Sequence, residues 1–551
     1  MPGLAWPGQT GMLARMRPLL GILLLLGGLM PAARAEILPD EVAILYNSTI
    51  PDSRKLAETY RQARGIPQEN VIALDMPTAA TIARDDYDRS IRDPLRRQFE
   101  VRGWWKRQQD TGGLKVPVVN KIRVLVTIRG VPLRISPTPK KPGPAPKPGE
   151  PPKPVDPMAG RDDASVDSEL AMFGIENLPT EGVLQNRFYK SAKGIGDSNL
   201  PFMVLTARID AASNETCERM IRDAVETEKT GLWGKAYVDI ANKFPQGDQW
   251  LEAVVKQNRE AGIPTLVDRY NDTLPTNYPM EDAALYYGWY DWNVSGPFLN
   301  ERFRFRKGAV AMHLHSFSAD QLSDITKNWC APLLEKGAAV TVGNVYEPYL
   351  HLTHDFGMLN ERLQAGHSWV EACWMAIPAA SWQGVVLGDP LYRPFRHFGG
   401  TGIKQEADIE YRALRAAGVE WKANLLERQK QIEQASERMK SGILAEAAGL
   451  ELLERKEMDK AAEWFRTAKR DYQKDQDKLR QDFNLIGIDR TAGRKDVAVR
   501  SLKDAVTVYG ALPEATALRG WLDILDPPPP PPADPTKPPA DAVKPPAAKG
   551  P

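Results

Sequence analysis

Two histidines, His313 and His315, follow a short apolar run, Ala309–Met312. If this run is a strand, residues two apart point to the same side, and two imidazoles at that spacing can share a Zn²⁺ ion. Further groups able to complete such a site occur nearby, at Glu347, His351, His354 and Asp355. All six histidines of the chain fall between residues 313 and 397, which makes this region the first place to expect chemistry.

A second chemistry is open at the same place, because Ser316 next to a histidine could act as a nucleophile with imidazole as its base. No oxyanion motif accompanies Ser316. A third interpretation is structural, since histidines at strand ends also hydrogen-bond neighbouring loops. The candidate catalytic residues are therefore His315, Ser316 and Glu347, and the candidate ligands for Zn²⁺ are His313, His315, His351, His354 and Asp355.

The stretch Gly308–Tyr349 must position these residues. We expect a strand at Ala309–Met312, a second strand at Ala338–Val342 and a helix between them. The helix is indicated by a capping pair, an apolar stripe and a terminal glycine: Ser318 with Gln321, then Leu322, Ile325, Trp329 and Leu333, then Gly337. A strand, a helix and a strand with short joints predict a parallel crossover. Ligands bind beyond the carboxyl ends of such strands, at the edge expected to hold His313, His315, Ser316, Asn344 and Glu347.

Alternating strand and helix patterns extend this unit in both directions, so residues 36–400 are predicted to form an α/β domain with a mostly parallel sheet flanked by helices. The clearest strands are apolar and β-branched: Val42–Tyr46, Val71–Leu74, Ile122–Ile128, Phe202–Ala207 and Lys235–Ile240. Residues 136–157 contain ten prolines, which predicts a surface loop inserted into this domain.

Two further segments have a structural and a functional interpretation. The acidic cluster Asp162–Glu169 could supply catalytic carboxylates, or it could begin a helix and complement the helix dipole. Six aromatic residues in Ala283–Phe298 could bind sugars or peptides, or they could form a core strand with a turn. In both segments we favour the structural interpretation.

The composition becomes charged and helical after the α/β region, and residues 401–525 are predicted to be a separate helical domain. Met458–Tyr472 and Lys495–Tyr509 align without a gap at an offset of 37 and share small and large apolar positions. This resembles tetratricopeptide repeats, whose unit is about 34 residues. Residues 526–551 hold twelve prolines and are predicted to be disordered.

The N-terminal 35 residues have the pattern of a secretory signal peptide. Arg15 and Arg17 precede an apolar run, Leu19–Leu29, and Ala33-Arg34-Ala35 predicts cleavage before Glu36. The mature chain is then exported, periplasmic or extracellular, and without a membrane span. A net charge of +1 gives no electrostatic case for nucleic-acid binding. Cys217, Cys330 and Cys373 are expected to be small buried hydrophobic residues.

The order of elements in residues 40–395 resembles an uncharacterised family of exported bacterial proteins and, more distantly, the gingipain-like cysteine peptidases of the caspase–hemoglobinase fold. The motifs are short: Gly130-Val131-Pro132, Ser165-Val166-Asp167, Arg208-Ile209-Asp210, Gly337-Ala338-Ala339 and Gly388-Asp389-Pro390. Those peptidases need a His-Gly after one strand and a Cys after the next. Here Gly288-Trp289-Tyr290 takes the first place and His315-Ser316 the second, so a cysteine dyad is not supported.

The resemblance implies a hydrolase-like fold without the family's catalytic pair. We therefore expect a degenerate binding or scaffold module of the cell envelope, whose helical repeats dock an envelope protein. The alternative is a hydrolase that uses a metal or a Ser/His pair on an envelope or extracellular substrate.

Overall fold

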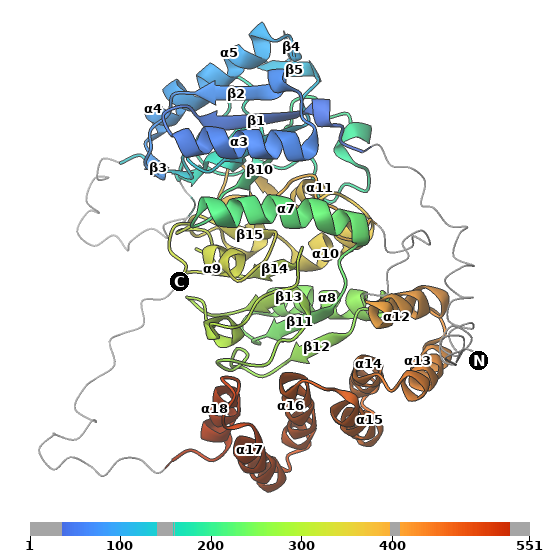
Figure 1. Ribbon diagram of the computed structural model, residues 1–551. Helices are drawn as coiled ribbons and strands as arrows, with labels where there is room; N and C mark the ends of the chain where they lie inside the picture. The colour runs from blue at the N-terminus through green and yellow to red at the C-terminus, as the bar shows by residue number, and fades with distance from the viewer. Residues whose placement is uncertain (1–35, 140–157, 159, 397–407, 529–551) are drawn as a thin grey trace, which may run out of the picture.

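The computed structural model describes residues 36–139, 158, 160–396 and 408–528. The chain forms three layers, which are a six-stranded sheet with its helices, a four-stranded sheet, and an array of C-terminal helices (Figure 1). This confirms the α/β class with parallel-rich sheets followed by helices. The predicted signal peptide, most of the proline-rich loop and most of the proline-rich tail lie outside the described residues.

The six-stranded sheet is parallel except at one pair, where β15 runs antiparallel to β17. Its order is β15 (Thr341–Asn344), β17 (Gly384–Leu387), β10 (Leu205–Ile209), β6 (Val124–Ile128), β1 (Val42–Asn47) and β2 (Val71–Leu74). Both faces are covered, because Val42 and Ile44 pack in one buried cluster and Ala43 and Leu45 in another. Helices α3 (Pro51–Arg64) and α7 (Asn214–Thr230) pack against each other beside this sheet (Figure 1).

The four-stranded sheet is parallel throughout and precedes the helical layer. Its order is β12 (Thr265–Asp268), β11 (Lys235–Ile240), β13 (Ala283–Trp289) and β14 (Val310–His313). A parallel bridge between Val310 and Val340 joins β14 to the residues before β15. From β11 the chain passes through α8 (Pro245–Glu260) to β12 on one side and then to β13 on the other. This reversal is a topological switch point, where open α/β sheets bind their ligands.

The predicted crossover unit forms both of its strands and little of its helix. β14 forms within one residue of its expected bounds, whereas β15 begins three residues later than expected and belongs to the six-stranded sheet. Of the described residues between these strands, Cys330–Glu335 (α9) are helical. Ser318 does not cap a helix, because its Oγ accepts a hydrogen bond from the Asn344 N–H and its carbonyl oxygen accepts one from Cys330. Tertiary bonds to β15 and α9 thus replace the predicted capping pair.

The acidic cluster has a structural role, as we favoured. Ser165 caps the short helix α6 (Val166–Leu170) by accepting a hydrogen bond from the Ser168 N–H. Asp167 accepts hydrogen bonds from Thr127 and from Arg208. The side chains of Asp167 and Arg208 are almost fully buried. The Asp167 carboxylate therefore ties α6 to the neighbouring strands β6 and β10.

The C-terminal helices follow one another in an array that packs against the four-stranded sheet. They are α12 (Ile409–Glu420), α13 (Leu425–Met439), α14 (Gly442–Glu454), α15 (Met458–Asp471), α16 (Asp475–Thr491), α17 (Lys495–Tyr509) and α18 (Ala515–Leu525). Both aligned segments are helices, α15 and α17. Among the described residues, no helix combines the length and apolar character that crossing a bilayer requires.

The helical array shares its core with the sheet, which differs from the separate domain expected from composition. Leu450, Phe483 and Trp521 belong to the same buried cluster as Tyr237 of β11 and Leu266 of β12. The two layers therefore bury one continuous apolar surface between them.

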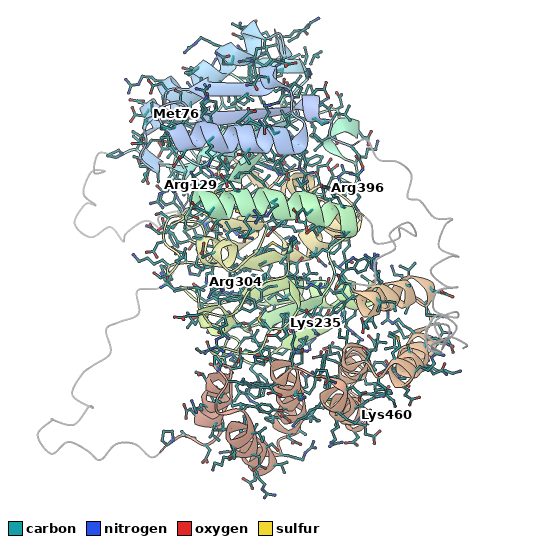
Figure 2. The ribbon with its side chains drawn as sticks, in the orientation of Figure 1. Met76, Arg129, Lys235, Arg304, Arg396 and Lys460 are labelled. Atoms are coloured by element: carbon teal, nitrogen blue, oxygen red, sulfur yellow. The ribbon has the colours of Figure 1, made fainter. Side chains whose placement is uncertain are left out.

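A fully buried ionic cluster also joins the two layers. Arg480 of α16 donates two hydrogen bonds of 2.7 Å to the carboxylate of Glu446 on α14. Lys235 of β11, which is labelled in Figure 2, also pairs with this carboxylate. Its Nζ lies 3.6 Å from a Glu446 carboxylate oxygen. Although burial opposes ionisation, Arg480 and Lys235 lower the pKa of Glu446 to about 2. Lys235 of the sheet thus pairs with Asp282 and with a helical carboxylate more than 200 residues later in the chain.

Candidate functional site

We use the term histidine edge for the predicted site residues His313, His315, Ser316, Glu347, His351, His354 and Asp355. His313 is the most firmly held of them. The Asp291 N–H donates to its Nε2 at 3.2 Å, so Nδ1 carries the proton and donates to the Tyr286 hydroxyl at 3.0 Å. The ring stacks on Trp329 with centroids 3.3 Å apart, and burial together with His315 lowers its pKa well below the ordinary value. His313 is therefore neutral, and both of its nitrogens are engaged.

His315 is buried among aromatic rings. Its Nδ1 accepts the Phe317 N–H, and the buried Nε2 has no hydrogen-bond partner among the described residues. The rings of Trp292 and Tyr290 lie 4.8 and 5.3 Å from it, centroid to centroid. Burial lowers the pKa of His315 to about 4, against the opposing charge of Asp291. A histidine with so low a pKa is a weak base, and no carboxylate hydrogen-bonds to it among the described residues, so His315 is poorly suited to activate Ser316.

The other predicted residues occupy separate places. His354 is buried with a pKa lowered by burial to about 3, whereas His351 is exposed. Asp355 caps α10 (Phe356–Gln364) by accepting the Met358 N–H, and a Glu347 carboxylate oxygen accepts the Tyr349 N–H. Ser316 makes no hydrogen bond to a histidine in the part of the chain that the structure describes.

The predicted Zn²⁺ ligands do not come together. Within the described ranges, no three His, Cys, Asp or Glu side chains form a group that could hold a metal ion. His313 uses both nitrogens inside the fold, Asp355 caps a helix, and His351 faces solvent. All three cysteines are buried and unbridged, and burial raises the pKa of Cys330 to about 12. Among the described residues, the predicted ligands of the histidine edge therefore form no metal-binding group, and His313 is held by hydrogen bonds within the fold.

A different site opens where the four-stranded sheet meets the helices. We call it the sheet–helix cleft, and it has two adjoining parts that share Asp268, Tyr270, Leu274 and Trp521. The polar part has a volume of about 420 Å³ and the apolar part about 540 Å³. Volumes of this size are typical of small-molecule sites. The floor comes from the sheet and the cover from α14, α16 and α18.

Three aspartates reach this region from the ends of adjacent strands. Asp239 and Asp268 are paired in register on β11 and β12, so they project from the same face of the sheet about 5 Å apart at their Cα atoms. Asp291 follows β13 closely and lines the polar part together with Asp268. The aspartates thus mark the switch point around β11, where a ligand is expected.

The first two carboxyl groups share a buried environment. Asp239 is only 1% exposed, and its Oδ2 accepts the N–H of Leu274, a residue that lines both parts of the cleft. Its Oδ1 is buried and has no hydrogen-bond partner among the described residues. Burial and the neighbouring Asp268 raise the pKa of Asp239 well above its ordinary value, and burial raises that of Asp268 to about 7. Near neutral pH the pair therefore holds a proton.

Comparison with known proteins gives no relative from which to transfer a role. No protein-family model, no curated protein and no solved structure matches this chain. The site must be interpreted from its own residues.

The wall opposite the aspartates is basic and aromatic. The Arg490 guanidinium of α16 lies 3.6 Å from the Tyr270 ring centroid and 5.1 Å from that of Trp521. Arg519 of α18 lines the same polar part from an exposed position. The cleft therefore sets carboxylates of the sheet against guanidinium groups of the helices.

The sequence contained a weak signal for this site. Asp239 lies inside the predicted strand Lys235–Ile240, where an acid interrupts a buried apolar run. Such an interruption costs stability unless the charge is paired or neutralised, so it deserves a functional hypothesis. Arg490 and Arg519 could not be assigned, because nothing local in a helix predicts which sheet edge it will cover.

Proposed function

We propose that this chain is an exported ligand-binding module whose ligand occupies the sheet–helix cleft. The observation that carries the proposal is the cleft itself, built from strand ends at a topological switch point on one side and from helices on the other. Export is supported by the signal-peptide pattern of residues 1–35. The helical array has a binding role in this proposal, because it completes the site.

The proposed origin from a gingipain-like hydrolase fold is supported by one proximity. The two places where those peptidases carry their histidine and cysteine follow β13 and β14, which are adjacent parallel strands. Tyr290 and His315 stand there with ring centroids 5.3 Å apart. Because neither a His-Gly nor a cysteine occupies these places, we propose that the ancestral chemistry is lost and that binding remains.

The outer surface of the helices supports the further proposal of an envelope partner. Apolar side chains are exposed on it, with Leu426 of α13 at 69% and Val508 of α17 at 71%. A protein partner could cover these side chains without entering the cleft.

A thermal-shift panel tests the binding function. We expect at least one class among short peptides, sugars, nucleotides and fatty acids to raise the melting temperature of the wild type by a few degrees at saturation. Thr276→Trp, a change at an exposed position of the polar part, should remove the shift because the indole fills the cleft. Trp292→Ala, on the exposed surface beside His315, is the matched control and should keep it. No shift with any class, or a shift lost only in Trp292→Ala, would contradict the proposal.

A second candidate function, hydrolysis of the bound ligand, is favoured by the carboxyl pair. Two neighbouring carboxyl groups with different pKa values can divide the work, the ionised one activating water and the protonated one giving its proton to the leaving group. Water would then add across the cleaved bond, with its hydroxyl on the electrophilic carbon and its proton on the leaving group. Asp239→Asn should abolish such turnover and leave binding intact. If the wild type bound the ligand and formed no hydrolysis product, hydrolysis would be refuted and binding would remain as the function.

A further inference from the structure

The polar part of the cleft separates opposite charges on its two walls. The sheet wall carries Asp268, Asp272 and Asp291, and the helix wall carries Arg490 and Arg519. Asp523 also lines the helix wall, one turn after Arg519, so that wall is mixed and the sheet wall is purely acidic. A ligand that spans the cleft therefore meets carboxylates at one end and guanidinium groups at the other.

The arginines are not consumed by the fold. Neither Arg490 nor Arg519 forms an ion pair or a side-chain hydrogen bond with another residue of the described ranges. Arg490 is held by ring stacking between Tyr270 and Trp521, which leaves its N–H donors for another partner. A guanidinium presents these donors in a fork that suits a carboxylate.

The aspartates also retain acceptor capacity. Asp291 takes hydrogen bonds from Thr273 and Ser295 on Oδ2, and no described residue donates to its Oδ1. Asp268 takes the Tyr270 N–H on Oδ1. Asp239, the register partner of Asp268, has a buried Oδ1 without a hydrogen-bond partner among the described residues. An ammonium group offers three donors and a positive charge, and no described residue on the sheet wall of the polar part carries a positive charge.

The apolar part accommodates the body of the ligand. Its lining joins the polar part at Asp268 and Leu274 and continues over Tyr237, Tyr278, Leu450, Met458 and Phe483. Such a surface binds aliphatic or aromatic side chains through burial of apolar area. The neighbouring polar part leaves room for a short backbone.

We propose that the ligand of the sheet–helix cleft is a short peptide with free termini and at least one apolar side chain. Its ammonium group binds Asp268, Asp272 and Asp291, its carboxylate binds Arg490 and Arg519, and its apolar side chain enters the apolar part. This inference rests on the proposed binding function and specifies its substrate class.

Calorimetric titration with Ala-Leu-Ala tests the inference on the full mature chain. We expect the free peptide to bind. N-acetylation or C-amidation of the peptide should lower its affinity at least tenfold. Arg519→Gln should reduce the difference in affinity between free and amidated peptide, because one of the two carboxylate partners is missing. Asp272→Asn should reduce the difference in affinity between free and acetylated peptide, because one carboxylate partner of the ammonium group is missing. Asp272 and Arg519 are both exposed, so we expect the two variants to fold. Arg500→Gln, on the exposed face of α17, is the matched control and should keep the wild-type preference for free peptide termini.

The two proposals can fail separately. Equal binding of free and blocked peptides, or binding of another panel class in the cleft with none of Ala-Leu-Ala, overturns the peptide inference and leaves the binding function standing. No cleft-dependent ligand in the whole panel overturns both. An unchanged terminal preference in Arg519→Gln and Asp272→Asn also contradicts the assigned charges.

Discussion

The histidine edge and the sheet–helix cleft both lie beyond the carboxyl ends of strands in the same parallel run, and the two adjoining cavities of the cleft give it space for a ligand. At the histidine edge, His313 stacks on Trp329 and bonds to Tyr286 and Asp291, while His315 is enclosed by Tyr290 and Trp292. At the cleft, the strand ends carry aspartates and face helices that stand back from them.

This difference shows what a strand-end rule can and cannot identify. The rule selects an edge of the sheet, but the segments that cover the edge decide which part stays open. The loop of residues 317–329 covers β14 and β15 locally. The ends of β11 and β12 are covered by α16 and α18, which begin more than 200 residues later. Each prediction below tests one side of this comparison.

The largest effect is expected where the helices join the sheet. Glu446→Ala removes the carboxylate that the buried Arg480 and Lys235 share and leaves them Asp477 and Asp282 as partners, which should cost about 3–5 kcal/mol of unfolding free energy. The measurement is a urea melt, with Glu437→Ala at an exposed position of α13 as the control. A loss below ~1 kcal/mol would mean that the sheet and the helices are separate bodies, as composition suggested.

A smaller loss is expected at the histidine edge. His313→Ala removes a ring stacked on Trp329 and two hydrogen bonds, so stability should fall by roughly 2–4 kcal/mol. His351→Ala, at an exposed position, should stay within about 0.5 kcal/mol. If His313→Ala lost no more stability than His351→Ala, the structural role of His313 would be refuted and a role in ligand binding or catalysis would be favoured.

A pH effect is expected from the carboxyl pair. Asp268 has a folded-state pKa of about 7, above the unfolded value of about 3.9, so the folded state holds a proton between these values that the unfolded state has lost. Stability from this group is therefore full near pH 4 and falls as pH rises toward 7. Relative to Asp268→Asn, the wild type should lose about 2 kcal/mol between pH 5 and pH 8.

Urea melts of the two proteins at both pH values measure this difference. Asp504→Asn, at an exposed position of α17, is the matched control. If the unfolding free energies of wild type and Asp268→Asn depended equally on pH, the raised pKa of Asp268 would be refuted. The opposite sign, with the wild type gaining stability as pH rises, would indicate a carboxylate that is paired in the fold.

Sequence alone predicted the α/β class, the strands β14 and β15 and the helices α15 and α17, because apolar periodicity is a local property. It failed at Ser318, whose predicted capping bond is replaced by bonds to Asn344 and Cys330 from other elements. It also placed the site at the histidines, since residue type suggested chemistry there. The cleft depends on Asp239, Arg490 and Trp521, which come together only through tertiary packing.

The most direct test of the central claim is hydrogen–deuterium exchange with and without the ligand found in the panel. The account predicts slower exchange in segments that line the cleft, residues 268–276, 484–491 and 516–524, and no change in residues 313–317 and 345–355. Protection confined to the histidine edge, with the cleft segments unchanged, would contradict the account and return the site to the histidines.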